Sequence, residues 1–146
     1  MPGSSRHDPY RNFNFRVEID GIASSSFSEV VFPDSTIGVV EYREGGDKTS
    51  SSRKLPGRVH YSNVVLRRGV SQSADLWNWW NTVRNGTPDR RNGVIVLLDT
   101  DLIEVRRWSF SGAWPCRYDV SPLAGRGEET VIETLELAVE SFSLGT

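Results

Sequence analysis

The stretch NFNFRVEID, residues 12–20, alternates polar and apolar side chains along its whole length. A period of two is typical of a half-buried β-strand, because successive side chains of a strand point to opposite faces of the sheet. The core-facing side chains of this strand would be Phe13, Phe15, Val17 and Ile19. Asp20-Gly21, which comes next, is a turn signal. The regular structure is thus expected to begin with a strand that covers a hydrophobic core.

Strand-like patterns recur along most of the remaining chain. We expect further strands at residues 27–31, 37–42, 59–67, 93–98, 102–114 and 130–142. The segment 93–98 is a continuous apolar run, which indicates burial on both faces. In the segment 102–114 the parity of the apolar residues changes, and a β-bulge near Arg106-Arg107 would explain the change. Trp114-Pro115 is expected to end this strand.

The last and longest strand is expected at residues 130–142, after a short turn or loop at 121–126. Alternation divides its side chains between two faces. The inward face would carry Leu135, Leu137 and Val139, and the outward face Thr134, Glu136 and Glu140. Most acidic residues in and near this strand are expected to be solvated: Glu128, Glu129, Glu133, Glu136 and Glu140.

One segment, residues 71–85, has the pattern of an α-helix. Its apolar residues recur at the spacing i, i+3, i+4 and i+7, which makes a single apolar stripe. The stripe consists of Leu76, Trp79, Trp80 and Val83. Ser71 or Ser73 can cap the N-terminus, and the negative charge of Asp75 suits the first turn. Asn85-Gly86 supplies a C-terminal stop.

Together these elements predict a mainly β fold in a single domain, residues 1–146. One helix among so many strands favours a β-sandwich or barrel of about six to eight strands, flanked by that helix. The edges of such a sheet must be covered by closure, by the helix or by a neighbouring subunit.

Two segments do not fit this regular pattern. Residues 1–10 are polar and are expected to be a flexible N-terminal arm. Residues 44–54, EGGDKTSSSRK, are expected to form a mobile loop that is longer than a tight hairpin requires. Pro56-Gly57 is expected to close this loop.

The composition argues against several functional classes. The formal net charge is −2, whereas general nucleic-acid or anionic-membrane binders need a basic excess. Cys116 is the single cysteine, so no intramolecular disulfide can form. No run approaches the roughly 18 consecutive apolar residues of a membrane span, and the polar N-terminus lacks a signal-peptide pattern. We therefore expect cytoplasmic assembly without membrane insertion.

No sequence motif indicates catalysis, a metal or a cofactor. His7, His60 and Cys116 lie far apart in the sequence, whereas the ligands of a zinc site usually come in close pairs. Neither a G-x-S-x-G elbow nor a G-x-x-x-x-G-K-[ST] phosphate loop occurs. We expect a protein that is not an enzyme, with no catalytic, cofactor-binding or metal-binding residues.

Five tryptophans leave one alternative function open, a carbohydrate-binding β-sandwich that stacks sugars on exposed rings. Trp79 and Trp80 lie on the apolar stripe of the expected helix, which favours an aromatic core. Trp77 lies off the stripe and is the better candidate for an exposed contact. Three arginine pairs have two equally supported interpretations: Arg67-Arg68, Arg90-Arg91 and Arg106-Arg107. They are either scattered surface charges, or they line a pore or contact acidic residues of a neighbouring subunit.

Several short segments carry a resemblance through their order and spacing. They are residues 8–13 (DPYRNF), 27–29 (FSE), 40–47 (VEYREGGD), 54–57 (KLPG), 67–69 (RRG), 76–79 (LWNW), 110–115 (FSGAWP) and 133–137 (ETLEL). Together they resemble the tail-tube family of contractile phages and phage-like injection systems. Residues 30–35 (VVFPDS) stand where many members carry a glycine-containing turn. This departure leaves open whether the chain is the main tube subunit or an initiating or terminal paralogue.

The resemblance implies hexameric rings that stack into a hollow tube, with an architecture similar to the ring protein of type VI secretion. It implies a surrounding sheath, a baseplate and a terminator as partners. The lumen would conduct DNA or protein cargo without sequence-specific recognition, in a virion tail or an injection particle. The arm and the long loop become candidate contacts between subunits or rings. The interface candidates are Asp8, Tyr10, Arg11, Phe13, Tyr42, Arg43, Glu44, Asp47, Lys48, Arg53 and Lys54.

Overall fold

The computed structural model describes residues 13–22, 27–43, 45, 52–124 and 129–145, which form nine β-strands and one α-helix. The elements are β1 (Asn14–Ile19), β2 (Glu29–Val31), β3 (Ser35–Tyr42), β4 (Arg53–Tyr61), β5 (Val64–Gly69), α1 (Asp75–Arg84), β6 (Arg91–Leu98), β7 (Glu104–Ala124), β8 (Glu129–Ala138) and β9 (Ser141–Leu144). The expected mainly β class with a single helix is confirmed, with one strand more than the upper bound of the expectation.

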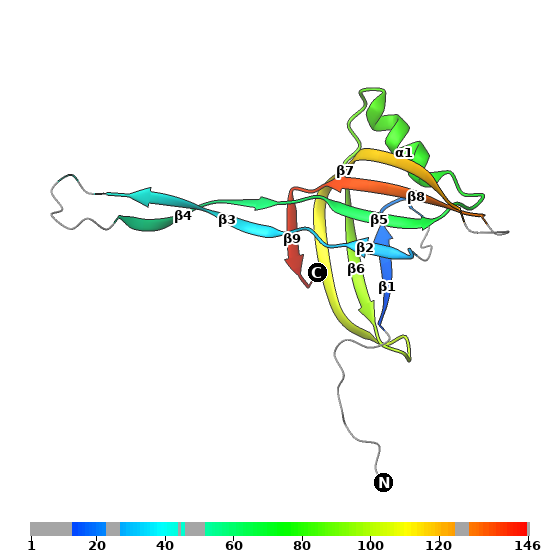
Figure 1. Ribbon diagram of the computed structural model, residues 1–146, viewed down its shortest axis with the longest axis horizontal. Coiled ribbons are helices and arrows are strands. Elements are labelled where there is room, and N and C mark those ends of the chain that lie inside the picture. The colour runs from blue at the N-terminus through cyan, green and yellow to red at the C-terminus, as the bar shows by residue number, and fades with distance from the viewer. Residues whose placement is uncertain (1–12, 23–26, 44, 46–51, 125–128, 146) are drawn as a thin grey trace, which may run out of the picture.

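The long strand β7 joins two layers of sheet (Figure 1). Its first part pairs antiparallel with β6 on one side and β9 on the other, and its second part pairs antiparallel with β8. The first layer is therefore β1-β6-β7-β9, and the second layer is β7-β8-β5-β2. The two layers form a sandwich-like body, and the described strands do not close into a barrel.

The hydrophobic core lies between the two layers. The first layer contributes Val17, Ile19, Ile95 and Phe110, and the second contributes Val64, Leu66, Leu135 and Leu137. Helix α1 adds Leu76 and Trp79, both fully buried, with Trp80 and Val83 packed partly against the core. A tryptophan the size of Trp79 removes roughly 150–250 Å² from water, or about 4–6 kcal/mol of transfer free energy. The predicted apolar stripe is thus what holds α1 to the sheet.

Helix α1 begins later than expected and without a serine cap. The N-cap position is Ala74, which has no side-chain capping bond. The Asp75 carboxylate instead accepts a hydrogen bond from the Leu76 N–H at 2.8 Å. The helix ends at Arg84, and Gly86 follows with a φ of +92°. The predicted C-terminal stop is confirmed, because a positive φ is a conformation that favours glycine.

Several expected strand boundaries are wrong. Residues 59–67 belong to two strands, because β4 ends at Tyr61 and β5 begins at Val64. Strand β7 does not end at Trp114-Pro115 but continues to Ala124, so much of the expected 121–126 loop is strand. A register shift between Pro115 and Arg117 accommodates the proline where β7 joins the second layer. Residues 130–142 are likewise divided between β8 and β9.

The expected bulge in β7 is confirmed within one residue. Leu97 pairs with Arg106 and Leu98 pairs with Glu104, so Val105 is the extra residue. The expected 44–54 loop is too long, because Arg53 and Lys54 already belong to β4. The rest of that loop, except Gly45 and Ser52, and the arm at residues 1–10 lie outside the described residues.

Within the described ranges, no helix is both long enough and apolar enough to cross a membrane.

Candidate assembly surface

Strands β3 and β4 form a two-stranded hairpin that projects sideways from the body (Figure 1). Two hydrogen bonds close its base: the Asp34 N–H donates to Ser62 Oγ at 2.6 Å, and the Ser62 N–H donates to the Asp34 carbonyl at 3.0 Å. Among the described strands, β3 and β4 pair only with each other. An isolated two-stranded hairpin is marginally stable in water, so this element needs a further contact.

Glycines shape the middle of the hairpin. Ile37 pairs with Val59 and Val39 pairs with Pro56, so β4 holds one residue more than β3 between these pairs. A Cβ at Gly57 would lie 3.0 Å from the Gly38 carbonyl oxygen. Gly57 therefore permits the close approach of the two strands at this bulge. Pro56-Gly57 lies within the hairpin and does not close a loop, which corrects the expectation.

The register gives the hairpin two different faces. The neutral face carries Ile37, Val39, Glu41, Lys54, Pro56 and Val59, with Lys54 opposite Glu41. The basic face carries Val40, Tyr42, Arg53 and Leu55, with Arg53 opposite Tyr42. An acidic residue thus stands opposite the cation on the neutral face but not on the basic face.

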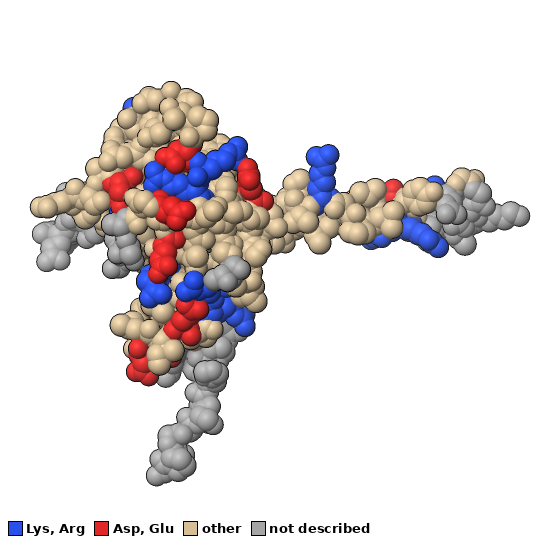
Figure 2. Space-filling view, turned by 180° about the vertical axis from the view of Figure 1, so that it is seen from behind, with Lys and Arg blue, Asp and Glu red and all other residues tan. Residues whose placement is uncertain are grey.

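Both faces expose large apolar side chains. The exposed fractions of Ile37, Val39 and Val59 on the neutral face lie between 51% and 66%, and those of Val40, Tyr42 and Leu55 on the basic face between 45% and 49%. Charges of both signs mix over the body, whereas on the face of the hairpin seen in Figure 2 uncharged surface separates a few side chains that are mainly Lys and Arg. Contiguous exposed apolar surface marks an interaction site. Because the exposed apolar side chains lie on both faces, the hairpin is suited to lie between two neighbouring subunits.

The structure brings four of the predicted interface residues together. Tyr42 and Arg53 form a cross-strand pair at the far end of the hairpin, Lys54 follows Arg53, and Arg43 is exposed just after β3. Phe13 lies elsewhere, half-buried just before β1. The other candidates lie outside the described residues: Asp8, Tyr10, Arg11, Glu44, Asp47 and Lys48.

The sequence-based interpretation missed the apolar residues of the hairpin. Ile37, Val39 and Val40 are all exposed, although their strand was expected to resemble the others. A signal was present, because apolar residues in 37–40 occur at both parities. A strand in a solvated layer has one apolar parity, so apolar residues on both faces of a strand outside the body indicate an intermolecular contact.

A buried ionic cluster fixes the start of α1 to the second layer. Arg68 and Glu133 are only 2% and 4% exposed. Arg68 Nε donates to Glu133 Oε1 at 2.7 Å, and a second nitrogen of Arg68 pairs with the Asp75 carboxylate. Tyr118 donates its hydroxyl proton to Glu133 Oε2 at 2.8 Å. The cluster therefore links β5, β7, β8 and α1.

This cluster alters the acidity of its members. Burial alone would raise the pKa of Asp75, but the hydrogen bond and positive charge of Arg68 outweigh it and hold that pKa below its ordinary value. Burial and the bond to Glu133 raise the pKa of Tyr118 to about 12. Glu133 was expected to be solvated, and Arg68 was expected either as scattered surface charge or in contact with a pore or an acidic neighbour. Their burial corrects these expectations, as does the burial of Thr134 between cross-strand neighbours Arg67 and Asp119.

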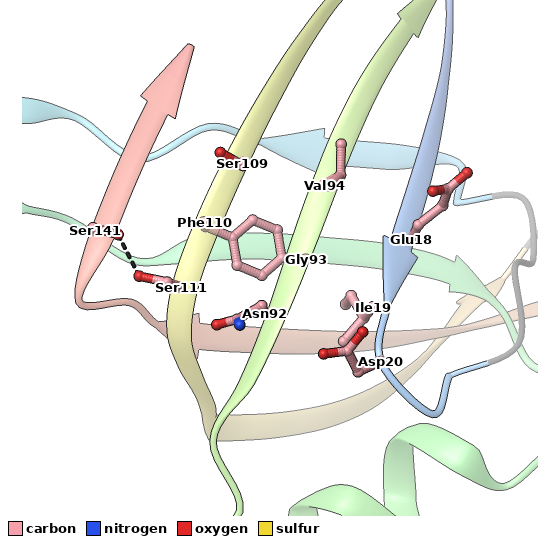
Figure 3. A pocket seen from close by; sticks show the side chains of 10 residues that line it. All are labelled: Glu18, Ile19, Asp20, Asn92, Gly93, Val94, Ser109, Phe110, Ser111 and Ser141. Atoms are coloured by element: carbon pink, nitrogen blue, oxygen red, sulfur yellow. Dashed lines mark hydrogen bonds between the residues drawn. The ribbon is translucent and has the colours of Figure 1, made fainter. Parts of the chain in front are cut away.

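A groove of about 430 Å³ lies on the first layer (Figure 3). Its lining residues are Glu18, Ile19, Asp20, Asn92, Gly93, Val94, Ser109, Phe110, Ser111 and Ser141. Two of these ten are acidic and none is basic. Gly93 permits the close packing of the buried Phe110 ring, because a Cβ at this position would fall 2.3 Å from that ring. Short hydroxyl side chains line the β7 and β9 side, where Ser111 and Ser141 share a hydrogen bond.

The tryptophans do not form a sugar-stacking platform among the described residues. Trp79 is buried, and Trp80, Trp108 and Trp114 are half-buried. Trp77 is 37% exposed, but its ring packs edge-on against Tyr118 and lies under the Arg84 guanidinium. In the same part of the chain, no cluster of His, Cys, Asp and Glu could hold a metal ion.

The comparison with protein families gives one match. The model of the family described as T4-like virus tail tube protein gp19 matches residues 11–143 of the chain. This span includes every described strand except the last residue of β9. No curated protein matches the chain.

Similar solved structures come from contractile injection systems. A chain in the baseplate of the anti-feeding prophage is 26% identical, with a TM-score of 0.73 over 92% of both chains. A chain in the extended sheath–tube complex of the extracellular contractile injection system PVC is 21% identical, with a TM-score of 0.77 over 91% of this chain and 88% of that one. Hcp1 from Flavobacterium johnsoniae is 13% identical, with a TM-score of 0.59 over 90% and 94%. The last two share the fold.

Proposed function

The chain belongs to the T4-like virus tail tube protein family, and from that premise we propose that its copies form hexameric rings which stack into the inner tube of a contractile tail or injection system. Membership makes it a structural tube protein, and the carbohydrate-binding alternative has no support. The ring size and the stacking are the new parts of the proposal.

One observation carries this proposal, the projecting hairpin with apolar residues on both faces. In an isolated subunit, Ile37, Val39 and Val40 are exposed on an element that the body does not cover, so they contribute no hydrophobic burial to its stability. Repeated stacking of identical subunits would cover that element in every copy except those at the tube end. The outer edges of β1 and β2, which pair with no other described strand, offer further places where copies can meet.

The proposed partners follow from where the similar structures were found. Those structures come from a baseplate, a sheath–tube complex and a tube-terminating cap. We assign this chain to a tube surrounded by a sheath and bounded by a baseplate and a terminator. Its lumen would conduct DNA or protein cargo. Assembly in the bacterial or archaeal cytoplasm, before the particle reaches its final location, completes the proposal.

Electron microscopy of the concentrated, purified protein in negative stain tests the proposed function. Six small domains in a ring should give particles about 80–100 Å across, alone or stacked into tubes. Particles with six-fold symmetry in class averages are the expected result. A protein that stays monomeric at every concentration, while remaining folded by circular dichroism, would contradict ring formation.

A further inference from the structure

The hairpin of one copy and the groove of another have complementary charge. Residues 35–61 contain five Lys and Arg against three Asp and Glu, a formal charge of +2; since the whole chain carries −2, the remainder carries −4. Among the lining residues of the groove, Glu18 and Asp20 are acidic and none is basic. The hairpin projects away from its own body (Figure 1), so contact between these two surfaces joins different copies.

We propose that the basic face of the β3–β4 hairpin docks into the first-layer groove of a second copy of this chain, with Arg53 directed toward Asp20. The inference rests on the proposed function and deepens it, because it names the two surfaces that meet when subunits assemble. It also assigns the two faces of the hairpin to different neighbours, since only one face enters the groove.

Asp20 is the carboxylate that the approaching Arg53 meets. Glu18 is already paired with Arg16 at 2.9 Å within its own chain. Asp20 lines the same β1 side of the groove (Figure 3). The described hydrogen bond near it is made by its carbonyl oxygen, which accepts from Arg91 Nη1 at 3.0 Å. An arginine and a carboxylate brought together in a partly enclosed groove make a charge-assisted hydrogen bond.

The remaining chemistry of the two surfaces also matches. Val40 and Leu55 are a cross-strand apolar pair one position from the Tyr42–Arg53 pair. Val94 of β6 lines the groove, and serine hydroxyls lie along its β7 and β9 side (Figure 3). The apolar pair covers Val94, and the Tyr42 hydroxyl lies where serine side chains can exchange hydrogen bonds with it. On the neutral face, Lys54 already lies opposite Glu41. This face therefore does not require an acidic partner from another copy.

Chemical cross-linking tests which face of the hairpin enters the groove. In a Cys116→Ser background, subunits with Arg53→Cys are mixed with subunits carrying Ser109→Cys, assembled, and treated with a short bis-maleimide. We expect a cross-linked dimer that contains one subunit of each kind. Two matched controls each change one partner of this pair. In the first, Lys54→Cys replaces Arg53→Cys, because Lys54 is next in the sequence but lies on the neutral face. In the second, Ser121→Cys replaces Ser109→Cys, because Ser121 is exposed on the second layer. Both control pairs should cross-link several times less.

Charge reversal provides a second, independent readout. Asp20→Lys and Arg53→Glu should each raise the concentration needed for half-maximal assembly by up to about fivefold, the effect of one exposed ion pair. The double variant should recover most of this loss. Added salt should weaken assembly of the wild-type protein more than assembly of the doubly neutral variant Arg53→Met/Asp20→Asn.

The outcomes separate this inference from the function on which it rests. If tubes form but Lys54→Cys cross-links to the groove as well as Arg53→Cys does, the docking arrangement is wrong and the tube function stands. The same holds if the double variant is no better than either single variant. If unmodified protein forms neither rings nor tubes, both proposals fail.

Discussion

The body and the hairpin use the same amino acids in opposite ways. In the core of the body, isoleucine and valine are buried: Ile95 and Val64 have no exposed surface. In the hairpin, Ile37 and Val39 are more than half exposed. The core residues of the body pack against one another within one chain. Under the proposed function, the apolar side chains of the hairpin become buried against other copies, so we explain its sequence by the assembly and not by the subunit.

The largest effect is expected from breaking the ionic cluster of the body. Arg68→Met leaves Glu133 and Asp75 without the cation that lies between them, and removal of one partner from a buried pair costs about 3–5 kcal/mol. Urea unfolding of the monomer measures the loss. The matched control is Arg67→Met, because Arg67 pairs with Glu29 at 2.7 Å in an exposed setting, where the cost is about 0–1 kcal/mol. Equal costs at the two positions would refute the special role of the buried cluster.

A second test exchanges isoleucine for alanine in each region. Ile95→Ala should lower the free energy of unfolding by about 2–5 kcal/mol, because it opens a cavity in the core. Ile37→Ala should change the unfolding of the monomer by less than about 0.5 kcal/mol, since the side chain is already exposed. Its effect should be on assembly, measured by sedimentation. A large loss of monomer stability in Ile37→Ala would show that the hairpin packs on its own body.

The body should also lose stability at alkaline pH through Tyr118. The ordinary pKa of tyrosine is about 10, and the folded protein raises the pKa of Tyr118 to about 12. A raised pKa means that the stabilising contribution is complete below about pH 10 and is lost as pH rises toward 12. Urea midpoints at pH 9 and pH 11 measure this loss. Tyr118→Phe should show a smaller difference between the two values, and an unchanged difference would exclude Tyr118 as its source.

A smaller effect concerns residues 46–52, the segment between β3 and β4 in the sequence that was expected to be part of a long loop. Deleting residues 46–52 should leave the body folded, because the core residues lie elsewhere in the chain. We expect shorter tubes or single rings from this deletion, seen by electron microscopy. Tubes of ordinary length would remove the loop from the list of assembly contacts and leave the two hairpin faces as the contact.

The sequence predicted the body well because local patterning and burial agree there. The alternation of residues 12–20 and the apolar stripe of α1 correspond to Val17, Ile19, Leu76 and Trp79 in the core. The end of β7 was misplaced because a proline usually ends a strand, whereas Pro115 lies at a register shift between two layers. That shift depends on pairing with β8, which is distant in the sequence.

The ionic cluster could have been found by the same parity argument. Glu133 shares the parity of Leu135 and Leu137, and Arg68 shares that of Val64 and Leu66. Both charges therefore belong to inward faces, and two opposite charges directed into one core must pair. The hairpin was harder to predict, because its apolar residues give the same sequence pattern as a strand of the body. Only the structure shows that no described layer covers them.

One measurement tests the central claim most directly: electron microscopy of Val39→Asp beside the conservative variant Val39→Ile. Val39 is 66% exposed on the hairpin, so neither change should alter the unfolding of the monomer. We predict that Val39→Ile forms tubes like the wild-type protein, whereas Val39→Asp stays folded but forms no long tubes, because a buried charge without a partner opposes stacking. Long tubes from folded Val39→Asp protein would contradict the claim that the hairpin joins the copies.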